Sequence, residues 1–398
     1  MSTPLTGTPP LGTPLTETSV LQDPSPSMDF PSRSWPGDEA KIRCRSQLTE
    51  CDRSHIDQLA YKWGTAPESY DIVISEGSFL ETPGRDAVLS VLPNGRYWHM
   101  PGGILAPDEL KPAIVSWLKE IAERQKRTVA VYSVGDEEVS LFREAGYEVN
   151  KFGEEPYLPL GDLTWKGKDY EWIRRQTNYC RRQGLEVSES LDPDSHREMG
   201  DELVEILNED LRRRTYARPL KLLVGDFDPH ALHRRRLFVA RSQETGRLEG
   251  FLACSPMKNG TAWSFETFRK RSDSPRGTMA FLFREVVDQL QAEGVQEVSL
   301  CLVPGKGVNR ETAPEAHWLV RSSLDLWYTR LNFLFNTRGQ NYFKSRFRPQ
   351  FRNRYVCVTP KSTCVSILSF LNTVGAFTPH LGNIARNLWH HCDRHVPD

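Results

Sequence analysis

The sequence contains no apolar run long enough to cross a membrane. Its 398 residues are 38% hydrophobic and 26% charged, whereas a membrane-spanning helix needs about 20 consecutive apolar residues. The N-terminus also lacks the basic and then apolar segment of a secretory signal. We therefore expect a cytoplasmic globular protein, long enough for two domains.

Paired cysteine motifs and nucleotide-binding motifs are absent as well. The eight cysteines are scattered without a CxxC pair, which favours reduced thiols over a zinc site or a disulfide scaffold. No Walker sequence and no dinucleotide fingerprint occurs, so neither ATP nor NAD is expected. No Ser-His-Asp or Cys-His arrangement stands out, and His390 and His391 are interpreted as surface residues. The sequence therefore predicts no metal and no cofactor.

An excess of charge of one sign is also missing. Lys and Arg together number 51, Asp and Glu 52, and the formal net charge is -1. Binding of a nucleic acid would therefore require a local basic patch.

The order of strand and helix patterns divides the chain into segments. Residues 1–37, rich in Thr, Pro and Ser, are predicted to form a disordered tail. Strand and helix patterns then alternate through two halves, 38–162 and 163–360, which predicts an α+β or α/β fold. Residues 361–398 are amphipathic and aromatic. We expect a helix packed on the protein there, with a membrane-surface helix as the alternative.

A basic turn lies between the strand pattern WSFETF and a long helix pattern. Ser274 is expected to be the N-cap and Pro275 the first helical residue. The backbone N–H groups of Arg276, Gly277 and Thr278 would then point outward, where the helix dipole favours an anion. Additional positive charge comes from Arg269, Lys270 and Arg271. This pattern indicates an anion site, and a solvated basic loop is the alternative.

Two further clusters combine basic with polar or aromatic residues. The first, on the helix pattern EWIRRQTNYCRRQG, comprises Arg174, Arg175, Asn178, Arg181 and Arg182. The second, NYFKSRFRPQFRNR, comprises Lys344, Arg346, Arg348, Arg352 and Arg354, interleaved with Phe343, Phe347 and Phe351. Both patterns suit contacts with a phosphate backbone. A solvated helix face and a half-buried strand edge would explain them equally well.

Five segments in this order resemble one known family. They are YKWGTAPESY, VAVYSVGDEEVSLFREAGYEVNKFGEEPYLPL, LTWKGKDYEWIRRQTNYCRRQGL, FETFRKRSDSPRGTMAFLFREVV and NYFKSRFRPQFRNRYV. Over about residues 56–360 the chain resembles the soluble C-terminal domain of bacterial phosphatidylglycerol lysyltransferases. The resemblance implies two tandem acetyltransferase-like (GNAT) domains with mixed central sheets. It also implies transfer of an aminoacyl group from aminoacyl-tRNA to a lipid hydroxyl, at a membrane surface.

A tail stands where the bacterial proteins carry a multi-helix membrane domain. In this respect the chain resembles the stand-alone fungal members of the ergosteryl-glycine synthase type. That resemblance implies glycyl-tRNA as donor, the 3β-hydroxyl of ergosterol as acceptor, and an aminoacyl-tRNA synthetase acting in trans. Three alternatives stay open. They are phosphatidylglycerol as acceptor, a non-catalytic module that binds RNA or membrane, and an acyl-CoA acetyltransferase.

The resemblance also assigns roles to residues. The family's Asp-x-x-Arg pair falls on Glu266 and Arg269 and its lysine on Lys344, which we predict to be catalytic. In a regular strand Glu266 and Arg269 would lie on opposite faces, so a bulge or strand end must intervene. Glu266 is expected to hold the aminoacyl ammonium or act as general base, or else to form a plain salt bridge. Lys344 is expected to stabilise a phosphate or the oxyanion.

Further residues are predicted to bind the donor. The expected substrate-binding residues are Arg271, Arg276, Gly277, Thr278 and Arg346. The expected tRNA-binding residues are Arg174, Arg175, Asn178, Arg181 and Arg182.

Overall fold

The structure is a computed structural model that describes residues 35, 42–75, 77–191, 193–214, 227–228, 232–331, 334 and 336–378. All of them belong to one compact unit, Ser34–Asp398. Apart from residue 35, the predicted tail lies outside the described residues, as do the end of the C-terminal extension and the two adjacent histidines. Trp35 is buried and packs edge-on against Trp117, with ring centroids 5.7 Å apart.

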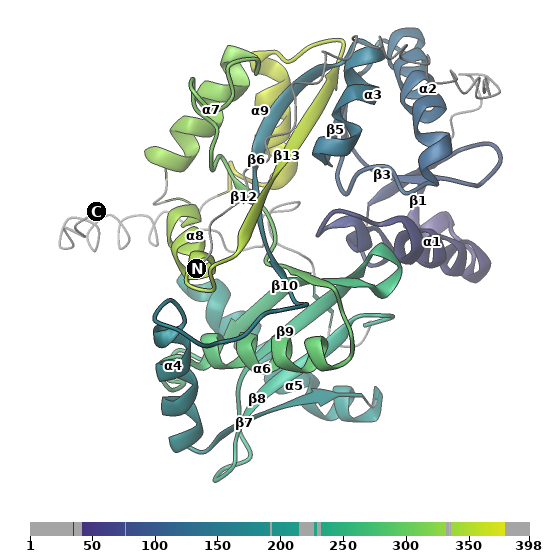
Figure 1. Cartoon of the computed structure of the whole chain (residues 1–398). Coiled ribbons are helices and arrows are strands. Elements are labelled where there is room, and N and C mark those ends of the chain that lie inside the picture. Colours follow the sequence, from purple (N-terminus) through teal and green to yellow (C-terminus); the bar gives the residue numbers. More distant parts are fainter. Residues whose placement is uncertain are drawn as a thin grey trace, which may run out of the picture. The chain divides into compact units, whose positions relative to one another are not determined.

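The first half of the described chain alternates strands with short helices (Figure 1). Its elements are β1 (Ile42–Cys44), α1 (Glu50–Trp63), the 3-10 helix η3 (Ser69–Val73), β2 (Ser78–Glu81), β3 (Val88–Asn94), β4 (Tyr97–Met100), α2 (Lys111–Arg124), β5 (Thr128–Val134), α3 (Val139–Glu144) and β6 (Glu148–Pro159).

The second half repeats this alternation. Its elements are α4 (Glu171–Arg182), β7 (Leu185–Ser190), α5 (Pro193–Arg213), β8 (Arg236–Ser242), β9 (Leu248–Met257), β10 (Ala262–Lys270), α6 (Thr278–Ala292), β11 (Glu297–Ser299), β12 (Val303–Pro304), α7 (Trp318–Thr329), α8 (Thr337–Ser345), β13 (Gln350–Thr359) and α9 (Cys364–Val374).

The described strands form one mixed sheet. Its order is β1-β2-β3-β4-β5-β13-β6-β11-β10-β9-β8-β7, and β12 pairs with β6. In each half, antiparallel strands lead to a strand–helix–strand unit whose two strands are parallel, β4–α2–β5 and β10–α6–β11. Strands and helices are thus combined in two acetyltransferase-like halves, and the predicted α+β class is confirmed.

The strand β13 connects the end of the described chain to the first half. It pairs antiparallel with both β5 and β6, although it belongs to the second half in sequence. The long strand β6 pairs with β13 and also with β11. The sheet therefore continues from one half to the other, and the domain limits drawn from the sequence stay a prediction.

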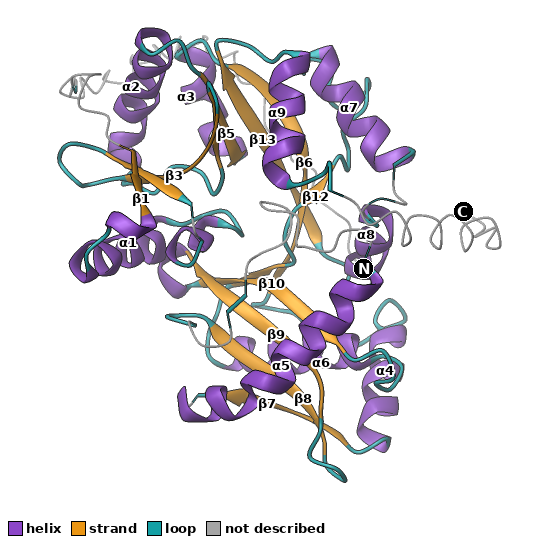
Figure 2. Ribbon diagram, turned by 180° about the vertical axis from the view of Figure 1, so that it is seen from behind, coloured by secondary structure: helices purple, strands orange, loops and turns teal. Residues whose placement is uncertain are grey.

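Helices cover both faces of this sheet (Figures 1 and 2). In the second half, α6 packs on one face around Phe265 and Phe283, whereas α5 packs on the other around Leu203 and Phe251. In the first half, α2 and α3 cover one face, and α7 and α9 cover the other. The helix expected after residue 361 is thus present as α9, packed on the sheet. No helix among the described residues has the length and apolar character to cross a membrane.

Candidate active site

Glu266 lies at a bulge in β10. The pairing of β10 with β9 shifts between Phe265 and Thr267, so that Glu266 is the extra residue. The bulge turns its side chain toward Ser255 of β9, whose hydroxyl donates to Oε2. The side chain is only 5% exposed, and Oε1 has no hydrogen-bond partner among the described residues. The bulge that the sequence required is therefore present, and it leaves one buried carboxylate oxygen without a hydrogen-bond partner among the described residues.

Two more carboxylates, Glu68 and Asp71, belong to this site, and we call the three with Glu266 the carboxylate cluster. Arg235 joins two of them, since its Nη2 lies 2.8 Å from Asp71 Oδ1 and 2.7 Å from Glu266 Oε2. Glu68 accepts a hydrogen bond from Ser133 Oγ. Asp71 is 24% exposed, so solvent reaches the cluster from the side of η3.

The carboxylate cluster contains three carboxyl groups, and Arg235 supplies one positive charge to it. Burial, and next the neighbouring Glu266 carboxylate, raise the pKa of Asp71 well above its ordinary value. Burial also raises the pKa of Glu68 to about 7, against the attraction of Arg354 and with help from Glu155 and Glu266. Like charges held together in a buried site favour binding of a proton or of another cation. The cluster is therefore suited to hold an ammonium group.

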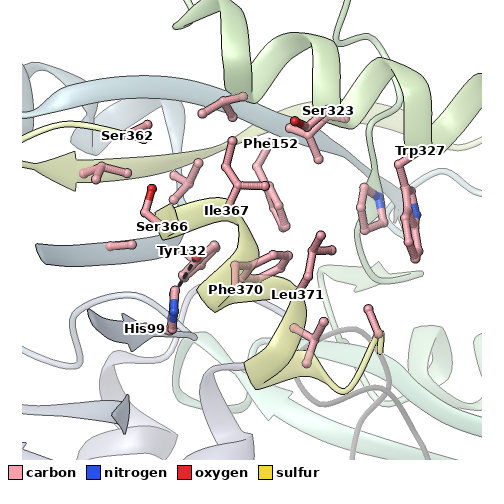
Figure 3. A pocket seen from close by; sticks show the side chains of 18 of the residues that line it. His99, Tyr132, Phe152, Ser323, Trp327, Ser362, Ser366, Ile367, Phe370 and Leu371 are labelled. Atoms are coloured by element: carbon pink, nitrogen blue, oxygen red, sulfur yellow. Dashed lines mark hydrogen bonds between the residues drawn. The ribbon is translucent and has the colours of Figure 1, made fainter. Parts of the chain in front are cut away.

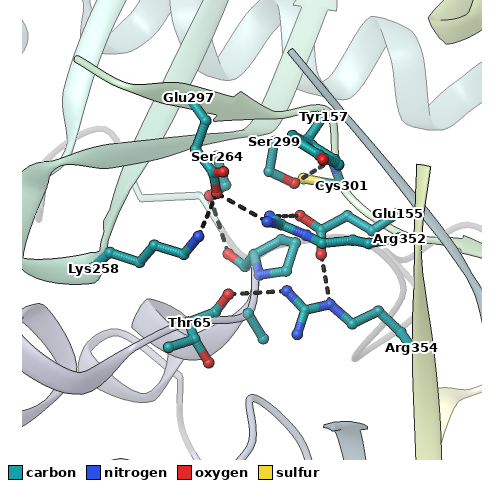
Figure 4. Close-up of polar contacts among 12 residues, drawn as sticks. Thr65, Glu155, Tyr157, Lys258, Ser264, Glu297, Ser299, Cys301, Arg352 and Arg354 are labelled. Carbon is teal, nitrogen blue, oxygen red and sulfur yellow. Dashed lines mark hydrogen bonds and ion pairs between the residues drawn. The ribbon is translucent and has the colours of Figure 1, made fainter. Parts of the chain in front are cut away.

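A second carboxylate site, around Glu155 of β6, is fully neutralised (Figure 4). Glu155 is completely buried and accepts from Arg352 and, at 2.6 Å, from Arg354 Nε. Burial alone would raise the pKa of Glu155, but Arg354 and Arg352 outweigh it and hold the pKa at about 2. Arg354 also donates to the backbone carbonyls of Thr65 and Ser133. This network ties β13 to the first half and has a structural role.

Lys344, at the end of α8, is buried beside the same region. Its Nζ donates to the carbonyls of Cys301, at 3.0 Å, and Leu302, at 3.5 Å. No carboxylate of the described residues lies within ion-pair distance of it. Burial therefore lowers the pKa of Lys344 to about 8, although Cys301 and Glu155 favour the charged form.

Cys301 joins the lysine to the bulge. The φ of Cys301, +65°, is a left-handed conformation that few residues other than glycine adopt. The Cys301 carbonyl accepts from Lys344, and the Cys301 Sγ donates at 3.2 Å to the carbonyl of Phe265, next to Glu266. Cys301 thus contacts Lys344, a predicted catalytic residue, and Phe265, the chain neighbour of a second one, Glu266.

The third predicted catalytic residue, Arg269, lies apart from them. Arg269 opposes Phe251 of β9, and Glu266 accepts from Ser255 of the same strand. Phe251 and Ser255 point to one face of the sheet, so Arg269 and Glu266 share that face. Three residues along a strand span about 10 Å. The Arg269 Nε lies 2.9 Å from Asp210 of α5. Burial lowers the pKa of Arg269 to about 10.

The helix after β10 begins later than the sequence predicts. Ser274 does not cap it, because its Oγ donates to the carbonyl of Arg271 in the preceding turn. The helix starts at Thr278, and Gly277 is its N-cap with φ +91°, a conformation that glycine adopts without strain. The Thr278 amide bonds to Pro275. The predicted start at Pro275 is therefore wrong, and the free N–H groups shift toward Met279 and Ala280.

The basic residues around this start have partners of several kinds. A Cβ at Gly277 would lie 2.5 Å from Oε1 of Gln176, so a side chain of α4 covers the glycine. Arg271 is buried and pairs with Glu205 of α5 at 2.7 Å. Arg276 is exposed and borders a hollow of about 320 Å³ in front of α6. Of the predicted anion-binding arginines, Arg276 is thus the one placed at the helix start.

A neighbouring hollow of about 500 Å³ lies between α4 and α8. Arg346 stacks over the rings of Trp172, at 4.8 Å, and Tyr342, at 5.8 Å. Trp172 lines both this hollow and the one in front of α6. Aromatic and guanidinium planes of this kind suit stacking with unpaired bases.

The predicted tRNA-binding helix α4 is only partly exposed. Arg174 donates to the backbone carbonyls of Trp165 and Gly167. Arg181 pairs with Glu285 at 2.8 Å, and Arg175 pairs with Glu171. Asn178 and Arg182 are exposed. The helix thus offers a mixed surface, of which Arg174 forms a structural part.

Sequence reasoning missed Glu68, Asp71, Glu155 and Arg235. Glu155 follows another glutamate, Arg235 is the middle of three consecutive arginines, and none of the four belongs to a recognisable spacing. The available signal was burial, because a charged residue inside a strand such as EVNKFGEEPYLP needs a partner from elsewhere in the fold.

The fold and this site define a two-half, acetyltransferase-like domain with a buried centre of carboxylates and one lysine. Residues 61–358 match the model of the family described as phosphatidylglycerol lysyltransferase, C-terminal. The chain belongs to this family.

Two curated relatives agree with this assignment. A phosphatidylglycerol lysyltransferase of Bacillus subtilis is 25% identical over 262 residues, which are 66% of this chain and 30% of that protein. The lysylphosphatidylglycerol biosynthesis bifunctional protein LysX of Nocardia farcinica is 28% identical over 192 residues, 47% of this chain and 16% of that protein. The chain thus matches less than a third of the length of either relative.

Two solved structures share the fold. One, described as the C-terminal domain of a lysylphosphatidylglycerol synthetase from Agrobacterium fabrum, has a TM-score of 0.68 at 19% identity and covers 81% of this chain and 96% of that one. The L-PGS of Bacillus licheniformis also has a TM-score of 0.68, at 20% identity, covering 80% of this chain and 95% of that one.

Proposed function

We propose that this chain transfers an aminoacyl group from an aminoacyl-tRNA to a hydroxyl group of a membrane lipid. The observation that carries the proposal is that Cys301 bonds both to Lys344 and to Phe265, the chain neighbour of Glu266. A buried cation and a buried carboxylate with an open oxygen are the two charges that an aminoacyl ester needs from a protein. Membership of the family supports the lipid as acceptor.

The reaction is a transesterification. The lipid oxygen bonds to the ester carbonyl carbon and loses its proton, and the bond from that carbon to the tRNA ribose oxygen breaks. The ribose oxygen takes a proton as it leaves. An aminoacyl ester is already activated, so positioning and charge stabilisation supply most of the catalysis.

The site offers a group for each step. Glu266 and Asp71 hold the α-ammonium group of the aminoacyl moiety. The positive charge of this group balances the excess negative charge of the carboxylate cluster. Glu68, whose pKa lies near 7, accepts the proton of the lipid hydroxyl as general base. Lys344 stabilises the oxyanion and protonates the leaving ribose oxygen, for which a pKa of about 8 is suitable. Arg269 remains a predicted catalytic residue, and its pairing with Asp210 favours a role in positioning β10.

The acceptor end of the tRNA is assigned to the two hollows that share Trp172. Arg346 and Tyr342 provide stacking surfaces there, and Arg276 lies where the α6 dipole favours a phosphate. Gln176 covers Gly277, which weighs against a pantetheine slot at that glycine and hence against an acyl-CoA acetyltransferase.

Phosphatidylglycerol is the acceptor best supported, because the family and both curated relatives are named for it. Those names also favour lysine as the transferred amino acid. Ergosterol and glycine, implied by the resemblance to fungal members, form the finer prediction. We also propose that an aminoacyl-tRNA synthetase supplies the donor and that the protein associates with the membrane surface from the cytoplasm.

The test is direct transfer of label. The purified full chain is incubated with tRNA charged with one radiolabelled amino acid and with vesicles that contain phosphatidylglycerol, ergosterol, or neither. We expect label in the phosphatidylglycerol fraction, lost after RNase treatment and in Glu266→Gln and Lys344→Met. Label in the sterol fraction would establish the finer prediction instead. A folded protein that labels no lipid from any aminoacyl-tRNA would contradict the proposal.

A further inference from the structure

We propose that the cavity between α7, α9 and the sheet binds an acyl chain of the glycerophospholipid acceptor. The proposal rests on the proposed function, since it assigns a place to the apolar part of that substrate. It concerns a region that the charged site does not include.

The cavity has a volume of about 390 Å³, within the range of small-molecule sites. Its floor is formed by β4, β5, β6 and β13, and α7 and α9 close it from above (Figure 3). Phe152, Ile367, Phe370, Leu371 and Trp327 present their side chains to it. Such a lining is complementary to hydrocarbon.

Charged groups are missing from the described lining, which contains no Asp, Glu, Lys or Arg. The ring of His99 is bonded at both nitrogens, to Tyr132 OH at 2.9 Å and to Ser369 Oγ at 3.1 Å. Burial lowers the pKa of His99 to about 4, so the ring is neutral at pH 7. An anionic ligand such as a nucleotide or a lipid headgroup therefore finds no counter-charge in the cavity, whereas an acyl chain needs none.

The cavity and the candidate active site lie on the same strands. On β5, Tyr132 lines the cavity and the next residue, Ser133, donates to Glu68. On β6, Phe152 lines the cavity, and Glu155, of the structural network beside the site, follows about 10 Å farther along the strand. The loop before β12 makes the same connection. The side chain of Leu302 packs against the apolar residues of the cavity, and its carbonyl accepts from Lys344. The cavity thus adjoins the charged site through shared elements, and we place the headgroup of the lipid at that site.

The two helices that close the cavity also carry exposed apolar side chains. Trp318 and Leu326 of α7 are 61% and 49% exposed, and Val365 and Leu368 of α9 are 56% and 51% exposed. Phe377, which lines the cavity, is 55% exposed. No charged residue occurs between Lys361 and Arg386. Such a surface suits contact with the hydrocarbon boundary of a membrane, from which a lipid can enter.

The helix α9 lies outside the region that matches the family. The match ends at residue 358, and α9 begins at Cys364. One of the two helices that cover this cavity is therefore supplied by a segment beyond the family match.

Fluorescence quenching by brominated lipids tests the proposal, because Trp327 lines the cavity. The full chain is mixed with vesicles of phosphatidylglycerol that carries brominated acyl chains, and the loss of tryptophan fluorescence is measured. The part due to Trp327 is the difference in quenching between the protein with Trp327 and the same protein with Trp327→Phe. Ser323→Phe places a ring in the cavity, whereas Ser322→Phe places the same ring on the exposed side of α7. We expect Ser323→Phe to weaken the Trp327 quenching at least tenfold and Ser322→Phe to leave it unchanged. Equal quenching in the two variants would overturn the proposal, as would quenching of Trp327 by a brominated sterol but not by brominated acyl chains.

Transfer assays separate this proposal from the proposed function. With aminoacyl-tRNA as donor, Ser323→Phe should raise KM for long-chain phosphatidylglycerol about tenfold but leave transfer to glycerophosphoglycerol, the headgroup without acyl chains, unchanged. Unchanged KM for the long-chain lipid would refute the cavity assignment while the enzyme stands. Cavity-dependent quenching without transfer from any aminoacyl-tRNA would support the cavity and refute the enzyme.

Discussion

Replacement of Lys344 by methionine should remove activity and yet increase stability at neutral pH. Burial lowers the pKa of Lys344 to about 8 from the ordinary 10.5, and a tenfold change in acidity is worth about 1.4 kcal/mol. Holding this lysine charged in the fold therefore costs about 3 kcal/mol. The substitution removes that cost but leaves the carbonyls of Cys301 and Leu302 without their donor, a loss of about 1 kcal/mol each. Lys344→Met should thus be about 1 kcal/mol more stable than the wild type at pH 7.

The sign of this difference should reverse at high pH. The pKa of Lys344 is lower in the folded than in the unfolded chain, so the cost is present in full below pH 8. It is relieved as the pH rises from about 8 to about 10.5, where the folded protein holds the neutral amine. The wild type should therefore gain about 3 kcal/mol relative to the variant over that interval. Urea unfolding at pH 7 and pH 10, followed by tryptophan fluorescence, measures both differences.

Lys111 provides a matched control. It is similarly buried, at 6% exposure against 2% for Lys344, but its Nζ lies 2.6 Å from Glu138 and 2.7 Å from Asp108. Lys111→Met leaves the buried Glu138 without its cation and should lose about 3 kcal/mol. If Lys344→Met loses as much as Lys111→Met, with no dependence on pH, the inference that Lys344 is a costly, unpaired charge is wrong.

Three further predictions concern the same site. The rate of aminoacyl transfer should be bell-shaped in pH, rising through about 7 as Glu68 ionises and falling above about 8 as Lys344 loses its proton; a flat profile would exclude both roles. Glu155→Gln leaves Arg352 and Arg354 without their shared carboxylate and should lower the unfolding free energy by about 3 kcal/mol. The wild type should lose the contribution of Glu155 as the pH falls from about 4.5 to 2. The melting temperatures of wild type and variant should therefore lie closer together at pH 3 than at pH 7. Gly277→Ala introduces a left-handed alanine in contact with Gln176 and should cost at least about 1 kcal/mol; adding Gln176→Ala should restore only part of it.

The fold class and the irregularity of β10 could be predicted from the sequence. The alternation of patterns predicted the α+β class, because a period of two or of 3.6 reports which side of a strand or helix is buried. The spacing of Glu266 and Arg269 called for an irregular strand, and the bulge is there. The resemblance to the family, rather than local pattern, pointed to Lys344, which the fold buries beside Cys301. The start of α6 was misplaced because Ser274 and Pro275 also suit a turn, and the left-handed conformation of Gly277 decided between the two.

The tertiary structure decided everything that depends on residues distant in the chain. Glu68, Asp71 and Arg235 meet Glu266 only because β9, β10 and η3 pack together, and a carboxylate becomes functional through the charges around it rather than through its neighbours in sequence. The same holds for the cavity under α9, whose lining comes from strands and helices between Tyr97 and Phe377. Periodicity determines which face of an element is apolar, whereas the pairing of β13 between β5 and β6 determines which apolar faces meet, and this depends on the packing of the whole sheet.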